Sequence, residues 1–145
     1  MKFKTLSKKD AQILTAMASG IIPRGGSSFE LGAADLEDQW LPRTDNLLSR
    51  MPAVSRMAMK FTARILNYLW PVIYLRKATA MTLLSEKERT LLFQKIEASS
   101  FSGTAFLLPI KAIVFPAFYG LSEVKEAIGY KERFPVSDDF EGVKD

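Results

Sequence analysis

The sequence predicts an all-α protein that folds as one compact, bundle-like domain of five to seven helices. Apolar residues recur at the three- and four-residue spacing of a helix along most of the 145-residue chain. Ser7 and Ser85 are each followed, three residues later, by an acidic residue, which is the capping-box pattern of a helix start. No segment alternates apolar and polar residues for long enough to indicate a strand, and no Asn-Gly or Asp-Gly turn occurs.

The first helix is expected to begin after Ser7, whose side chain can form a capping box with Asp10 in place of the usual Glu. Apolar residues then recur on one face at helical spacing, namely Leu14, Ala18 and Ile21. Gly20 and Pro23 are typical of a helix end. We therefore expect the helix to stop there and a loop to follow at residues 24–28.

Prolines are expected to shape the next two helices. The second helix begins near Ala33, and Pro42 should break or kink it into two short helices. Pro52 suits the first turn of a third helix, which Pro71 should end or bend. One side of this third helix is apolar and consists of Val54, Phe61, Ile65 and Tyr68.

The clearest helix start in the chain is the capping box formed by Ser85 and Glu88. This helix should run to about Ala98, and the residues that it is expected to bury are Leu91, Leu92 and Ile96. The next helix covers residues 104–119 and is apolar almost all round. Such a helix is typically central to a core or in contact with something on both sides.

A last short helix is expected at residues 122–128, with Gly129 as its C-terminal cap. Residues 131–145 are polar and acidic, and we expect them to form a loose tail. The sequence thus predicts a helical domain at residues 1–130 followed by this tail.

The chain contains neither cysteine nor histidine. This absence excludes disulfides, a thiol nucleophile, zinc sites built from cysteine or histidine, iron–sulfur clusters and histidine-ligated haem. It also removes the most common general acid–base side chain. The composition therefore favours a structural or partner-binding protein, and it leaves carboxylates as the side chains that could still catalyse a reaction.

Two motifs could still support catalysis, metal binding or phosphate binding. Asp35 and Asp38 share a helix face, so they could form a carboxylate dyad or bind a divalent metal. However, acidic residues at a helix start are typical of an exposed first turn. Gly25 and Gly26 resemble part of a phosphate-binding loop, but the strand and the lysine of that motif are missing. We therefore assign no catalytic, cofactor-binding or metal-binding residue.

Charge is unevenly distributed along the chain. The net charge is +4 overall, +6 for residues 1–84 and −2 for residues 85–145. No acidic residue occurs between Asn46 and Ser85, and within this block a basic stripe follows the third helix at four-residue intervals, formed by Arg56, Lys60 and Arg64. A basic block of this kind favours an anionic partner.

Three kinds of anionic partner could bind this block. No helix-turn-helix is recognisable, so nucleic acid is not expected. An anionic membrane surface could bind the stripe together with the aromatic run at residues 68–74. A protein partner fits the enrichment of Met, Trp, Tyr and Arg, the residue types that favour interfaces. The predicted partner-binding residues are Arg56, Lys60, Arg64, Trp70 and Tyr74.

Several short motifs, in their order and spacing over residues 6–130, resemble the gluconate 2-dehydrogenase subunit 3 family. The matching pieces are Ile21-Ile22-Pro23, Met51-Pro52-Ala53-Val54-Ser55-Arg56, Leu84-Ser85 with Glu88-Arg89, Phe118-Tyr119, Glu123-Val124 and Ile128-Gly129-Tyr130. Members of this family are small helical partner subunits of flavin-dependent oxidoreductases of the glucose–methanol–choline type.

The resemblance implies a non-catalytic accessory subunit that stabilises, matures or docks a large flavoprotein subunit. The FAD would then belong to the partner, and a cytochrome or a membrane component could complete the complex. The N-terminal residues lack a twin-arginine pair and a continuous apolar run, which favours a cytoplasmic location. Co-export with the partner to the periplasm, or membrane association, remains the alternative.

Overall fold

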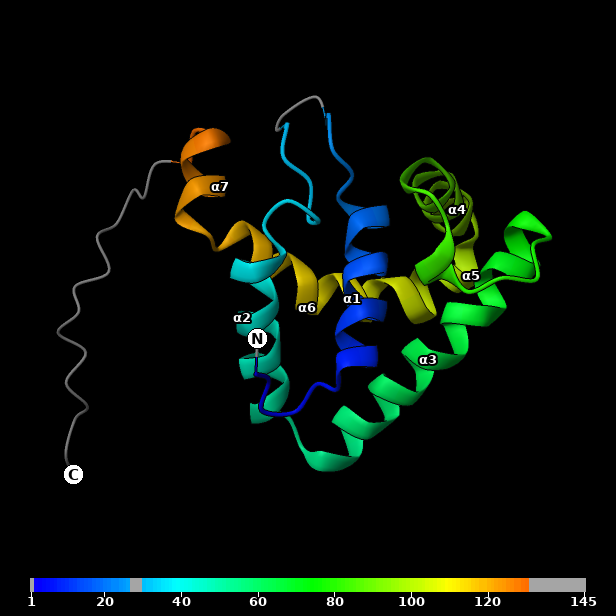
Figure 1. Cartoon of the computed structure of the whole chain (residues 1–145), viewed down its shortest axis with the longest axis horizontal. Coiled ribbons are helices and arrows are strands. Elements are labelled where there is room, and N and C mark those ends of the chain that lie inside the picture. Colours follow the sequence, from blue (N-terminus) through cyan, green and yellow to red (C-terminus); the bar gives the residue numbers. More distant parts are fainter. Residues whose placement is uncertain (1, 27–29, 131–145) are drawn as a thin grey trace, which may run out of the picture.

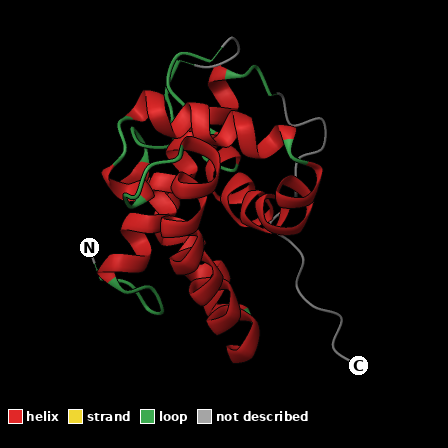
Figure 2. Cartoon of the chain, turned by 90° about the vertical axis from the view of Figure 1, so that its right-hand side faces the viewer, coloured by secondary structure: helices red, strands yellow, loops and turns green. Residues whose placement is uncertain are grey.

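The computed structural model describes residues 2–26 and 30–130, and within these ranges the chain is all-α, as predicted. Helix α1 (Lys8–Ile21) lies at the centre and contacts α2 (Glu37–Arg50), α3 (Ala53–Leu75) and α4 (Glu86–Ala98) (Figure 1). Figure 2 shows the same arrangement from the side, with the helices of the described residues in red. The predicted tail at residues 131–145 lies outside the described residues.

The first helix begins as predicted. The Ser7 side chain accepts a hydrogen bond from the backbone N–H of Asp10, and the Asp10 carboxylate accepts one from the N–H of Ser7, which completes the capping box. Leu14 and Ala18 are buried. Gly20, however, lies inside the helix, which continues to Ile21.

The second helix differs from the prediction in two respects. It begins at Glu37, because residues 33–36 form a turn that buries Ala33 and lets its carbonyl accept a hydrogen bond from Trp40 Nε1 at 2.7 Å. It is also one helix and not two, with Pro42 inside it. Pro42 falls in the second turn, where its missing N–H removes one hydrogen bond while the rest of the helix remains paired.

Helix α3 is a single element of 23 residues, about 34 Å long. Pro52, which was predicted in the first turn, is the N-cap residue just before the helix, and Pro71 does not end it. The helix continues one turn further, to Leu75. The cap residue Arg76 has φ of 53°, and its backbone N–H donates to the carbonyl of Pro71. No helix in the described part of the chain has the length and hydrophobicity needed to cross a membrane.

The C-terminal half begins with a short 3₁₀ turn, Met81–Leu83, before α4. The capping box of Ser85 and Glu88 at the start of α4 is confirmed. The apolar helix predicted at residues 104–119 is divided into a π-helix (Gly103–Leu107) and α6 (Leu108–Tyr119), and the short helix α5 (Ser100–Ser102) precedes them. Helix α7 (Ser122–Ala127) follows, and Gly129 after it has φ of 70°.

The core lies between α1 and the helices around it. Its largest buried side chains are Trp40, Trp70, Phe93 and Phe118. Leu92 and Ile96 of α4 are buried as predicted, but the prediction for Leu91 was wrong, because that side chain is 45% exposed. Leu91 directly precedes Leu92, and on a helix with 3.6 residues per turn this one-residue step rotates its side chain by about 100°, toward solvent.

Candidate functional site

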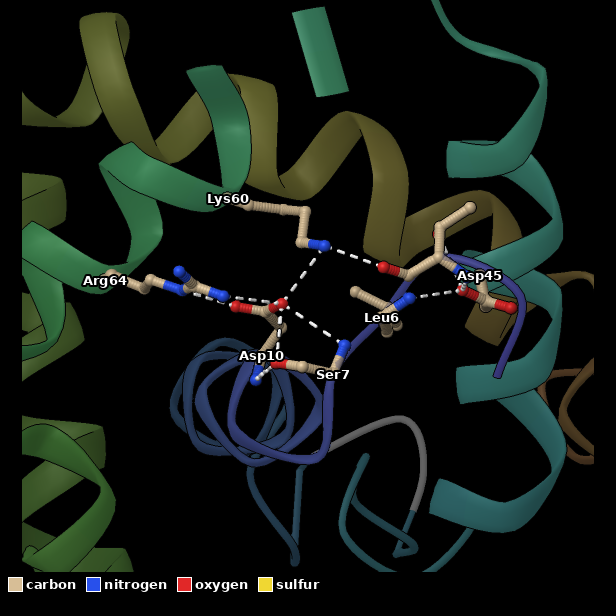
Figure 3. A network of polar contacts seen from close by, with 7 residues as sticks. Leu6, Ser7, Asp10, Asp45, Lys60 and Arg64 are labelled. Atoms are coloured by element: carbon tan, nitrogen blue, oxygen red, sulfur yellow. Dashed lines mark hydrogen bonds and ion pairs between the residues drawn. The ribbon is translucent and has the colours of Figure 1, made fainter. Parts of the chain in front are cut away.

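The basic stripe of α3 meets α1 at a buried carboxylate. Arg64 donates from Nε to Asp10 Oδ1 at 2.7 Å and from Nη2 to Oδ2 at 3.1 Å. Lys60 Nζ lies 3.2 Å from Asp10 Oδ2 and donates to the carbonyl of Thr5 at 2.7 Å. Figure 3 shows both side chains pointing from α3 toward Asp10. The carboxylate thus fastens α3 to the start of α1.

Asp10 is held in its charged form by these contacts. Burial acts to raise its pKa, but hydrogen bonds from Arg64, Ser7 and Lys60 outweigh burial and lower the pKa from 3.8 to about 2. The Asp10 side chain is 4% exposed, so a partner does not reach it. Two of the three stripe cations therefore have an intramolecular role that the sequence did not reveal.

A second buried carboxylate lies close by, at Asp45 of α2. Asp45 accepts hydrogen bonds from the backbone N–H groups of Lys4, Thr5 and Leu6 and from the hydroxyl of Thr5. Figure 3 shows the bond from Leu6. Burial works to raise its pKa, but these hydrogen bonds prevail and lower it. The segment before α1 is thereby tied to α2.

The other three predicted partner-binding residues, Arg56, Trp70 and Tyr74, lie at other positions along α3. The prediction for Trp70 was wrong, because the ring is 1% exposed and packs edge-on to Phe93, with centroids 5.7 Å apart. Tyr74 is half-buried against the core, and its carbonyl accepts a hydrogen bond from Lys95 Nζ. Arg56 is half-buried near the end of α2, where Nη1 lies 3.5 Å from the carbonyl oxygen of Leu48.

The most unusual surface of the molecule is the solvent side of α3. We define the α3 face as its exposed large apolar residues, which are Val54, Met57, Phe61, Ile65, Tyr68, Leu69, Val72 and Ile73. Val54 is 80% exposed and Phe61 is 64% exposed. Among the exposed residues of α3, a helix described throughout, Arg64 alone is charged. The apolar side seen in the sequence is therefore turned away from the core.

An apolar groove continues the α3 face toward α6. The groove has a volume of about 470 Å³, and its walls come from α3 on one side and from the π-helix and α6 on the other. Ala58 and Thr62 of α3 lie across from Ala105, Pro109 and Ala112. The outward residues of α6 are also uncharged: Leu108, Pro109, Ala112, Pro116 and Tyr119. The sequence indicated such a helix by its lack of polar residues, but not its pairing with α3.

The described residues of the two weaker chemical motifs make local contacts. Asp35 pairs with Arg24 at 2.6 Å and accepts a hydrogen bond from the N–H of Gly32, so this carboxylate closes a local turn. Within residues 2–26 and 30–130, no group of three or more acidic side chains is placed to hold a metal ion. Gly25 has φ of 73° and donates its N–H to the carbonyl of Glu30, and Ser27 and Ser28 lie outside the described residues.

The chain matches no protein-family model, no curated protein and no solved structure. The fold and the surface are therefore the observations that bear on function.

Proposed function

We propose that this protein is a non-catalytic accessory subunit that binds a larger protein through the α3 face. The observation that carries the proposal is the exposure of eight large apolar side chains on one helix. Soluble monomers rarely leave a contiguous apolar patch of this kind open to water, because water contact with apolar surface is unfavourable. A patch of this kind typically marks an interface with another molecule.

The composition of the α3 face fits a protein interface. Met57, Phe61 and Tyr68 are of the residue types enriched at interfaces, whereas acidic residues, which interfaces disfavour, are absent from α3. Asp10 holds Arg64 and Lys60 beside this face and so fixes α3 against the domain. The helix therefore presents its apolar side as a rigid surface, which lowers the entropic cost of binding.

The proposed partner class is a flavin-dependent oxidoreductase, with FAD held by that partner. This assignment rests on the motif resemblance and agrees with a chain that has no histidine or cysteine for redox chemistry of its own. In this proposal the accessory subunit stabilises, matures or docks the large subunit. Its own side chains take no part in the oxidation.

A double variant of the α3 face tests the proposal. Purified with an affinity tag from its host, the wild-type chain is expected to bring down a protein with flavin absorbance, identified by mass spectrometry. Phe61→Glu/Ile65→Glu should remove at least 90% of that flavin signal, because each substitution places a charge against an apolar surface (about 1.4 kcal/mol for each tenfold loss). Circular dichroism should show unchanged helix content, since both side chains are exposed.

The matched control replaces two exposed leucines outside α3 and α6. Leu83→Glu/Leu91→Glu introduces the same charges at residues that are 78% and 45% exposed, and it should retain the flavoprotein. Equal recovery with both double variants would contradict a docking role for the α3 face. A monodisperse wild-type monomer without any flavoprotein would contradict the proposed function itself.

Anionic lipid is a second candidate partner, favoured by a specific observation. The exposed apolar side chains of α3 lie in the block without acids, and Lys9 Nζ lies 5.9 Å from the ring centroid of Tyr68 at the edge of the face. Peripheral binding would place Phe61 and Tyr68 in the headgroup region. In flotation with vesicles, this alternative predicts binding that requires phosphatidylglycerol and weakens as salt rises from 50 to about 500 mM. Binding that ignores both variables would eliminate it.

A further inference from the structure

The groove between α3 and α6 has small side chains on both walls, set among larger apolar lining residues that include Met51, Phe106 and Ile113. Ala58 and Thr62 on α3 follow each other at one-turn spacing, and Ala105, Pro109 and Ala112 repeat this pattern on the facing wall. Met59, Ala63 and Ile110 lie deeper between the two helices. At the small positions on both walls, the backbone of a third helix could approach α3 and α6 closely, at the 8–10 Å axial distance of packed helices.

The chemistry of the groove favours a helix over a small molecule. Its lining has no charged side chain, and its polar side-chain groups are the hydroxyls of Ser55 and Thr62. Small-molecule sites need several convergent polar groups to orient a ligand. An apolar helix needs none, because its backbone groups are already paired. The groove borders the α3 face, because Ala58 and Thr62 of its lining directly follow Met57 and Phe61 on the helix. The apolar residues of that face, from Val54 to Ile73, span about 28 Å.

The charged residues around α3 indicate which polar groups a helix bound in the groove would carry. In the part of the chain that the structure describes, no carboxylate pairs with Arg50, Arg56 or Arg76. Arg50 and Arg56 flank the beginning of α3, and Arg76 caps its end. These three cations bracket the apolar surface, and the absence of acids between Asn46 and Ser85 leaves their charge uncompensated along the helix.

We propose that the groove receives an apolar helix of the partner subunit, with small or flat residues along its contact side and carboxylates near both of its ends. This inference rests on the proposed function, because the helix belongs to the partner. The contact is a helix-in-groove interaction, in which apolar anchors at one-turn spacing enter the groove and the carboxylates meet Arg50, Arg56 and Arg76. A bilayer, in contrast, would cover the convex α3 face and leave the groove unfilled.

Photo-crosslinking in the intact complex tests where the partner lies. Benzoylphenylalanine is introduced at Ala58 in the groove and, as the control, at Ala127, which is exposed on α7 and outside the groove. The expected result is a crosslink from position 58 to an apolar, acid-flanked helical segment of the flavoprotein, and none from position 127. A complex that retains the flavoprotein but crosslinks at neither position, or only at an unrelated surface, overturns the inference and leaves the proposed function standing.

A peptide assay tests the chemistry without the partner. Two fluorescent 20-residue helical peptides share one leucine–alanine face and differ in carrying Glu or Lys at both ends. The full chain is expected to bind the Glu peptide about tenfold more tightly at low salt. Ala58→Trp/Ala112→Trp, which fills the groove from both walls, should weaken binding about tenfold, whereas Ala127→Trp should not change it.

Charge reversal completes the assay. Arg50→Glu/Arg76→Glu should exchange the preference, so that the Lys peptide binds more tightly. Equal affinity for both peptides, or affinity unaffected by the two tryptophans, overturns the inference. Vesicles of phosphatidylcholine with 30% phosphatidylglycerol form the lipid arm. Binding to these vesicles without binding to either peptide also overturns it, in favour of a membrane.

Discussion

Replacing Asp10 with alanine is expected to lower the free energy of unfolding by about 3 kcal/mol. The substitution leaves Lys60 and Arg64 without the carboxylate that pairs with both of them, and it removes half of the capping box of α1. Loss of one member of a buried ion cluster typically costs several kcal/mol, and loss of a cap about 1 kcal/mol. Urea unfolding followed by circular dichroism at 222 nm measures the change.

Asp38→Ala is the matched control for this prediction. Asp38 also lies in the first turn of a helix, but it is exposed and forms no ion pair among the described residues. Its removal should cost about 0.5 kcal/mol through the helix dipole. A loss of less than about 1 kcal/mol for Asp10→Ala would show that the contacts of Asp10 contribute little to the fold.

The same carboxylate gives a pH dependence of known sign. Its pKa is 3.8 in the unfolded chain and about 2 in the fold, so folding favours the charged form. This stabilisation is complete above about pH 5 and is lost as the pH falls from about 4 to 2, with a total of about 2 kcal/mol. The difference in unfolding free energy between wild type and Asp10→Ala should therefore shrink across this window. A constant difference from pH 6 to 2 would contradict the assignment.

Local patterns explain which elements the sequence could predict. Both capping boxes are confirmed because each depends on two residues three positions apart, Ser7 with Asp10 and Ser85 with Glu88. The start of α3 after Pro52 depends on the fixed φ of a single proline. Interior prolines were harder to judge, since tertiary packing keeps the helices around Pro42 and Pro71 continuous.

The candidate site depends on contacts that no local pattern contains. Helix α3 is apolar on two sides, so periodicity alone could not decide whether Trp70 or Phe61 enters the core. The partner of Arg64 is Asp10, 54 positions earlier in the chain, and the four-residue spacing of the basic stripe gives no sign of that pairing. The groove, likewise, requires two helices that are more than 40 positions apart in the chain.

Gly20 matches the sequence pattern of a helix end but has a different structural role. Its position near the end of α1 is typical of a helix stop, yet it lies within the helix at the contact with α4. A Cβ at this position would lie 2.6 Å from Phe93 Cε2 and closer still to Cδ2. Phe93 itself is 2% exposed and packs edge-on to Trp70, so its ring has little room to move. Glycine is needed here for close helix packing.

Gly20→Ala is therefore expected to destabilise the protein by about 2–3 kcal/mol, the typical cost of overpacking a core. Helix propensity alone predicts the opposite sign, a gain of about 1 kcal/mol from replacing glycine inside a helix. Thermal and urea unfolding of the variant distinguish these two expectations. Gly103→Ala is the control, because its nearest neighbour would be Ile96 O at 3.4 Å, an ordinary contact, and its effect should lie near zero or be stabilising.

A double-mutant cycle with Phe93→Leu assigns the loss to this contact. Phe93→Leu alone should cost about 1–2 kcal/mol, because the smaller side chain leaves unfilled space beside Trp70. In that background Gly20→Ala should cost at least 1 kcal/mol less than in the wild type, since the added methyl group then enters the space left by the ring. Additive effects of the two substitutions would mean that Gly20 is required for a reason other than its contact with Phe93. The close approach of α1 and α4 would then need a different explanation.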